Sequence, residues 1–141
     1  MKELLELRGV VEATPEAVAA ILLDVRPGGR SPLLVHGEVE APGDGDEFTV
    51  VLEGSRISVT VDRAARSVIQ QGEWWYRGVT TVEPDPRGSH VIHRVYNVAP
   101  GHGWAVRMVS RGPLLSAPTG FATQLEQLSR LLGVAAWVET D

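Results

Sequence analysis

An amphipathic stretch near the C-terminus constrains the fold more than any other part of the chain. Its large apolar residues recur at spacings of four, three and four: Phe121, Leu125, Leu128 and Leu132. That spacing places them on one stripe of a helix, for which Thr119, behind Pro118, is the expected N-cap and Gly133 the expected stop. Burial of each side chain is worth about 1.5–3 kcal/mol, so this helix needs a broad apolar surface to lie on.

Residues 34–98 predict such a surface, because they have the pattern of short strands joined by tight turns. Apolar and polar residues alternate with a period of two in 48–52 and 57–61, which is typical of half-buried strands. Turn-forming residues separate the runs at 41–47, 54–55 and 84–88. We therefore predict an antiparallel meander with one buried face.

The ends of the chain add a strand and helical segments. Residues 3–13 are rich in leucine and valine and predict a strand. Thr14 and Pro15 then provide the N-cap and first-turn proline of a short helix, which ends in the loop 24–32. We expect a loop at 99–103, then an interrupted helical region that ends at Gly133. The sequence does not assign a secondary structure to residues 134–141.

Length and composition favour one soluble domain over residues 1–141. The hydrophobic share of 43% is ordinary for a globular protein, and the net charge of −5 argues against nucleic acid as a partner. No apolar run approaches the ~20 residues that a membrane span requires. Because there is no cysteine and no signal-peptide pattern, we expect a cytoplasmic protein without disulfides.

The order of these elements resembles the helix-grip domains of the START/Bet v 1-like (SRPBCC, polyketide-cyclase-like) superfamily. The matching segments are ATPEAVAAILLDV, RISVTVDRAARSVIQQ and RGVTTVEPDPRGSHVIHRVYNV, and the resemblance covers roughly residues 4–133. It implies an α+β fold in which a curved antiparallel sheet wraps around a long C-terminal helix, with a short helix after the first strand. It also implies a cavity between sheet and helix, but the superfamily includes ligand carriers, aromatase/cyclases, oxygenase domains and chaperone regulators, so the fold assigns no reaction.

Strand alternation indicates which side chains would line this cavity. In the last strand we expect His93 and Asn97 to face inward, because the opposite choice would bury Arg94. In the two preceding strands, the register that buries Val82 points four further candidates inward: Gln70, Trp74, Tyr76 and Thr80. A bulge near Gly72 would reverse the direction of some of these side chains.

Five further residues complete the predicted ligand site. Phe48 belongs to the apolar wall of the sheet. Trp104 and Met108 lie where the chain crosses towards the helix, near the expected entrance. Phe121 and Leu125 come from the apolar stripe of the helix.

Two chemical roles are open at this site. An inward His93 could act as a general acid/base while the Tyr76 phenol donates to a ketone oxygen, which suits cyclisation or dehydration of a polyketide-like substrate. The alternative is a buried histidine satisfied by Asn97, Thr80 or water. Trp74 and Tyr76 could likewise stack on a ring system or simply fill the core.

Other chemistries lack a motif. His36, His90 and His102 show no metal-ligand spacing, so we predict no metal site. The chain also lacks a GxSxG elbow, a P-loop and a GxGxxG fingerprint, and we predict no cofactor.

The leading hypothesis is binding of a small hydrophobic molecule, aromatic or polyketide-like, between the sheet and the C-terminal helix. The second is a polyketide aromatase/cyclase or dehydratase that uses His93 and Tyr76. The third is a protein-interaction domain with an apolar patch around Trp75 and Trp137. Each hypothesis leaves open whether the protein forms a homodimer.

Overall fold

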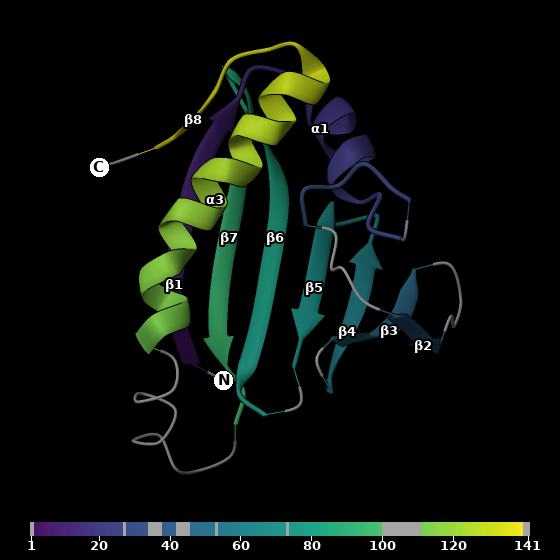
Figure 1. The fold of residues 1–141 in the computed structure, drawn as a ribbon. Helices are drawn as coiled ribbons and strands as arrows, with labels where there is room; N and C mark the ends of the chain where they lie inside the picture. Colours follow the sequence, from purple (N-terminus) through teal and green to yellow (C-terminus); the bar gives the residue numbers. More distant parts are fainter. Residues whose placement is uncertain are drawn as a thin grey trace.

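One antiparallel sheet forms most of the protein (Figure 1). The computed structural model describes residues 2–26, 28–33, 38–41, 46–52, 54–72, 74–99 and 111–139. Within these ranges the sheet has eight strands, in the order β2-β3-β4-β5-β6-β7-β1-β8. They are β1 (Lys2–Val11), β2 (Glu38–Ala41), β3 (Glu47–Leu52), β4 (Ser55–Asp62), β5 (Ser67–Gln71), β6 (Tyr76–Asp85), β7 (Gly88–Asn97) and β8 (Ala136–Val138).

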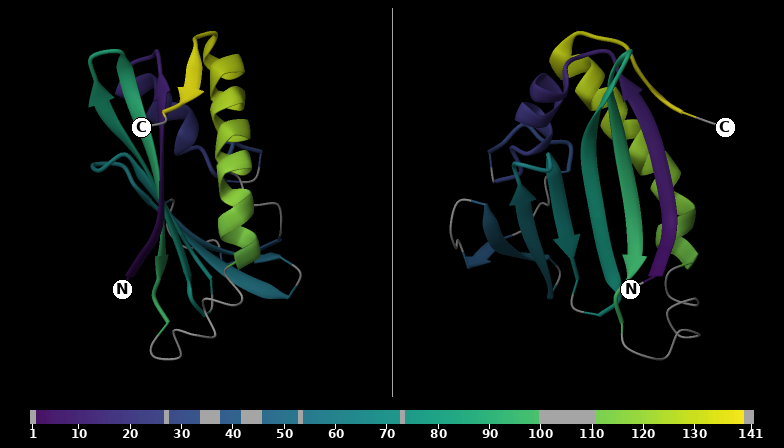
Figure 2. Two further views of the ribbon diagram at one scale, coloured as in Figure 1. Left: turned by 90° about the vertical axis from the view of Figure 1, so that its left-hand side faces the viewer. Right: turned by 180° about the vertical axis from the view of Figure 1, so that it is seen from behind.

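Two helices, α1 (Pro15–Leu22) and α3 (Arg111–Leu132), lie on the same face of this sheet (Figure 2). The long α3 runs across β1, β7 and β6, and α1 packs beside its C-terminal half. The predicted α+β helix-grip fold is therefore confirmed. None of the helices in the described ranges combines the length and apolar character that crossing a membrane requires.

The short helix α1 begins where the sequence predicts. Thr14 is its N-cap and accepts a hydrogen bond from the Ala17 amide at 3.2 Å, and Pro15 occupies the first turn. Its buried residues are Val18, Ala19, Ile21 and Leu22. This apolar side anchors α1 to the core between β6, β7 and α3.

The long helix α3 extends further towards the N-terminus than predicted. Thr119 is not its N-cap: the helix already includes Arg111, and it continues through Pro118. Because proline has no N–H, the carbonyl of Leu114 loses its usual helical partner there. Leu114 and Ala117 nevertheless continue one side of the helix and line the pocket between α3 and the sheet. Gly133 ends the helix as predicted, with a φ of 67°.

The strand β8 is formed by the tail whose state the sequence left open. Residues 136–138 pair with residues 9–11 of β1, and the Glu139 amide donates to the carbonyl of Arg8 at 2.8 Å. The Glu139 carboxylate then contacts Arg87 at 2.8 Å and His90 at 3.0 Å, while Asp85 contacts both Arg87 and His90. Arg87 holds the pKa of the Asp85 carboxyl at about 2. This ion-pair cluster ties the C-terminal strand to the β6–β7 hairpin.

The register is unbroken over the paired residues of β5, β6 and β7, so within these strands no bulge reverses the direction of Gln70. Gln70 lies opposite Gly78, and Thr80 lies opposite both Val68 and His93. The inward-facing side chains of the three strands therefore form continuous rows across the sheet.

Close packing of α3 on β1 requires glycine at position 9. A Cβ atom at Gly9 would overlap the buried Leu125 side chain, with Leu125 Cγ only 3.2 Å away. Leu125 and Leu128 are both buried in the core here. The absence of a side chain at position 9 thus sets how near the C-terminal half of α3 lies to the sheet.

We predict that Gly9→Ala lowers the free energy of unfolding by about 1–3 kcal/mol, because the new methyl group overpacks the core. Urea denaturation measures this value. The control is Gly120→Ala, whose added methyl would meet nothing within 4 Å and should stabilise the helix by about 0.5–1 kcal/mol. Equal stability of Gly9→Ala and wild type would contradict the packing described.

Candidate functional site

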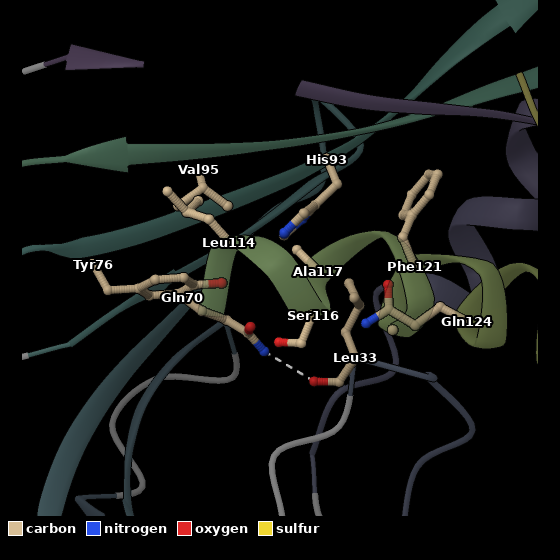
Figure 3. Close-up of a pocket in the computed structure, with 11 residues that line it drawn as sticks. Leu33, Gln70, Tyr76, His93, Val95, Leu114, Ser116, Ala117, Phe121 and Gln124 are labelled. Atoms are coloured by element: carbon tan, nitrogen blue, oxygen red, sulfur yellow. Dashed lines mark hydrogen bonds between the residues drawn. The ribbon is translucent and has the colours of Figure 1, made fainter. Parts of the chain in front are cut away.

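A pocket of about 270 Å³ lies between the sheet and the N-terminal half of α3 (Figure 3). This volume is near the lower limit of ~300 Å³ that is usual for small-molecule sites. The lining comes from the loop after α1, from β5, β6 and β7, and from α3. The lining residues are Leu33, Gln70, Tyr76, His93, Val95, Leu114, Ser116, Ala117, Gly120, Phe121 and Gln124.

Small residues of α3 form part of the pocket wall beside the larger Leu114 and Phe121. Ser116, Ala117 and Gly120 line it from the helix, whereas the following turns bury Leu125 and Leu128 in the core. Interiors are normally filled to the density of organic crystals. Small side chains at these positions leave part of the space between helix and sheet unfilled.

Tyr76 forms the wall at the start of β6. A Cβ atom at Gly78 would lie 2.5 Å from the Tyr76 hydroxyl oxygen, so this glycine lets the ring lie along the strand. Trp75 packs edge-on against the ring, with the centroids 5.5 Å apart. Burial raises the pKa of the Tyr76 phenol, so it stays protonated at neutral pH. The hydroxyl has no hydrogen-bond partner within the described residues.

His93 projects from β7 towards α3 (Figure 3). Its Nδ1 atom lies 2.8 Å from the hydroxyl oxygen of Thr80, and its ring stacks on Phe121 with the centroids 6.3 Å apart and an interplanar angle of 23°. Burial lowers the pKa of His93 to about 4. The ring is therefore neutral at pH 7.

Gln70 connects β5 to the loop after α1. Its side-chain amide nitrogen donates to the carbonyl of Leu33 at 2.9 Å (Figure 3). The Leu33 amide in turn donates to Ser31, whose hydroxyl donates to the carbonyl of Leu22 at the end of α1. This chain of hydrogen bonds holds Leu33 against the pocket.

The structure brings four of the predicted site residues together on the pocket wall: Gln70, Tyr76, His93 and Phe121. Thr80 is buried behind His93 rather than exposed to the pocket. Phe48 and Leu125 are buried in the adjoining core and do not line it. Trp104 and Met108 lie outside the described residues.

Two predicted residues do not line the pocket. The expectation that Trp74 faces inward is wrong, because β6 begins at Tyr76 and the strand alternation does not extend back to Trp74, which is 48% exposed. Asn97 does not line the pocket either. It lies opposite Tyr76 in the β6–β7 pairing, and its side-chain oxygen accepts a hydrogen bond from the Ala99 amide at 2.9 Å. The aromatic wall therefore consists of Tyr76 without Trp74.

Several lining residues were not predicted, most of them from α3: Leu33, Leu114, Ser116, Ala117, Gly120 and Gln124. A signal for the helical group was present, since Ala117, Phe121 and Gln124 are spaced four and three apart on one helix face. Leu33 had no local signal, because the hydrogen bond from Gln70 places it there.

The lining carries no Asp, Glu, Lys or Arg side chain among the described residues. The same part of the chain shows no group of His, Asp and Glu side chains that could hold a metal ion. The polar contribution to this pocket comes from hydroxyl, amide and imidazole groups alone. Such groups can orient a ligand by hydrogen bonds.

No family model and no curated protein sequence matches this chain. Solved structures do match its fold. The solution structure of the Polyketide_cyc-like protein Cgl2372 from Corynebacterium glutamicum is 21% identical, with 94% of this chain and 93% of that chain covered and a TM-score of 0.53. The solution structure of KanY protein is also 21% identical, with 91% and 93% covered and a TM-score of 0.50.

The fold and the pocket together define the helix-grip class, α+β proteins with a pocket between a sheet and a long helix. The similarity to these two solved structures extends over more than 90% of each chain. The resemblance proposed from the sequence is confirmed at the level of the fold.

We predict that acid destabilises the protein through His93. The unfolded chain takes up a proton near the ordinary pKa of 6.5, whereas the folded protein does so near 4. The free energy of unfolding should therefore fall as the pH decreases from about 6.5 to about 4. From pH 7.5 to 4.5, protonation of His93 should lower the free energy of unfolding of the wild-type protein by about 2–3 kcal/mol. Urea denaturation at the two pH values measures this loss, which should be absent in His93→Gln. An equal pH dependence of the two proteins would contradict the burial of His93.

Proposed function

We propose that this protein binds a small, neutral, largely apolar molecule in the pocket between the sheet and α3. The observation that carries this proposal is a set of polar groups in the pocket without partners among the described residues. They are the Tyr76 hydroxyl, the second ring nitrogen of His93 and the side-chain oxygen of Gln70. Each of these groups is open to the pocket, so a ligand that enters it could pair with them by hydrogen bonds.

The absence of a charged lining residue supports a neutral ligand. Burial of an ion without a counter-charge is costly, and the described lining offers none. The flat faces of Tyr76, His93 and Phe121 favour a ring system as the apolar part of the ligand. The name of the Corynebacterium neighbour, Polyketide_cyc-like, is compatible with an aromatic or polyketide-like molecule.

A cyclase or dehydratase is the second candidate, because His93 and Tyr76 line the same pocket. The protonated Tyr76 phenol could donate to a carbonyl oxygen. His93 is less suited to its role, since a pKa of about 4 makes it a weak general base at neutral pH. Binding without turnover therefore ranks first.

A protein-interaction domain ranks third. Trp137 and Leu131 are exposed at 38% and 49%, but scattered exposed apolar residues are normal on protein surfaces. The pocket is the more specific feature. The cytoplasmic location, the single domain over residues 1–141 and the homodimer remain predictions.

We predict that the neutral fluorescent probe N-phenyl-1-naphthylamine binds in the pocket with a saturable rise in emission. Ala117→Phe should weaken this binding at least about tenfold, because its ring fills the space next to Gly120. Fluorescence titration measures both dissociation constants.

The matched control is Ala122→Phe, which places the same ring on an exposed position of α3. It should bind the probe as wild type does. Equal weakening by both substitutions, or unchanged binding by Ala117→Phe, would count against this pocket as the binding site.

A further inference from the structure

We propose that Thr80 fixes the tautomer of His93, so that the pocket selects ligands with a hydrogen-bond acceptor at His93 and a donor at Gln70. This inference rests on the proposed binding function and specifies the chemistry of its ligand. Thr80 is a positioning residue here, since it acts through His93.

The argument begins with the hydroxyl hydrogen of Thr80. Thr80 is only 3% exposed and lies directly opposite His93 in the β6–β7 pairing. Within the described residues, the only hydrogen-bond partner of the hydroxyl is His93 Nδ1, at 2.8 Å. If Nδ1 carried a proton and donated it to Thr80, the hydroxyl hydrogen would be left buried without an acceptor.

The arrangement that satisfies this hydrogen has Thr80 donating to Nδ1. The neutral ring then carries its proton on Nε2. Nε2 has no partner among the described residues, and His93 lines the pocket. The imidazole therefore offers the pocket an N–H donor and no acceptor.

A similar argument fixes the polarity of Gln70. The carbonyl of Leu33 can only accept a hydrogen bond, so the Gln70 atom that faces it at 2.9 Å is the amide nitrogen. The Oε1 atom is left without a partner in the described part of the chain. Gln70 therefore offers the pocket a carbonyl acceptor.

The complementary ligand is neutral and carries two different polar ends. A carbonyl oxygen would accept from His93, and a hydroxyl or N–H group would donate to Gln70. The Tyr76 hydroxyl can serve either end, because it both donates and accepts. A ligand with the reverse polarity would leave the donor of His93 facing a donor, and buried polar groups without partners lose affinity.

The tautomer can be tested without any ligand, by long-range ¹H–¹⁵N correlation NMR of the histidine rings. We expect the His93 proton on Nε2 in wild type and in Thr80→Ser, which keeps the hydroxyl. Thr80→Val removes the donor and should shift His93 towards the Nδ1–H form; its thermal unfolding shows whether it remains folded. A proton on Nδ1 of wild-type His93, or an unchanged ratio of the two tautomers in Thr80→Val, would overturn the role of Thr80.

The selectivity is tested with four probes of one ring skeleton: 6-hydroxy-1-tetralone, 1-tetralone, 5,6,7,8-tetrahydro-2-naphthol and tetralin. Probes without the carbonyl should bind about tenfold more weakly to wild type and to Thr80→Ser, because one net hydrogen bond is lost. The same loss should weaken binding to Thr80→Val much less. Loss of the hydroxyl should weaken binding to wild type similarly, but not to Gln70→Met. Isothermal titration calorimetry gives the dissociation constants.

The outcomes separate this inference from the function on which it rests. Equal affinity of all four probes for wild type would overturn the selectivity and leave the binding function intact. Binding of none of them by a protein with the Nε2–H tautomer would overturn the selectivity together with the binding function.

Discussion

The structure depends on how close α3 lies to the sheet along its length. At its C-terminal half, Leu125 packs against the bare backbone of Gly9, and Leu128 is fully buried. At its N-terminal half, Leu114, Ala117 and Phe121 line the pocket that separates the helix from the sheet. One end of the helix is therefore packed and the other stands over a space. The small side chain of Ala117, between the larger Leu114 and Phe121, contributes to this unfilled space.

The polar groups of the pocket acquire their properties from the strands behind them. The unbroken register places Thr80 beside His93 and Gln70 beside Gly78, so each polar side chain has one fixed neighbour and one side open to the pocket. Burial keeps the His93 ring neutral and the Tyr76 phenol protonated. An uncharged site with defined donors and acceptors suits recognition of a neutral molecule better than proton transfer near pH 7.

Much of this fold was predictable because its signals are local. Period-two alternation predicted the strands and their inward rows, and Thr14 and Pro15 predicted the start of α1. The start of α3 was not predictable in this way, because Pro118 has the local signature of a helix start although the helix begins at Arg111 and continues through it. The three residues of β8 are too few for a periodic pattern, and pairing with β1 forms that strand.

The candidate site divides in the same way. Strand alternation indicated that Gln70, Tyr76 and His93 face the pocket. It misplaced Trp74, because the alternation applies only inside the strand that begins at Tyr76.

The most direct test of the hollow is the set of intermolecular NOEs between bound N-phenyl-1-naphthylamine and the protein methyl groups. We expect contacts to Val95 on β7 and to Ala117 on α3 in the same complex, because the probe should lie between sheet and helix. Contacts confined to exposed Leu131 and the neighbourhood of Trp137 would contradict an internal binding site.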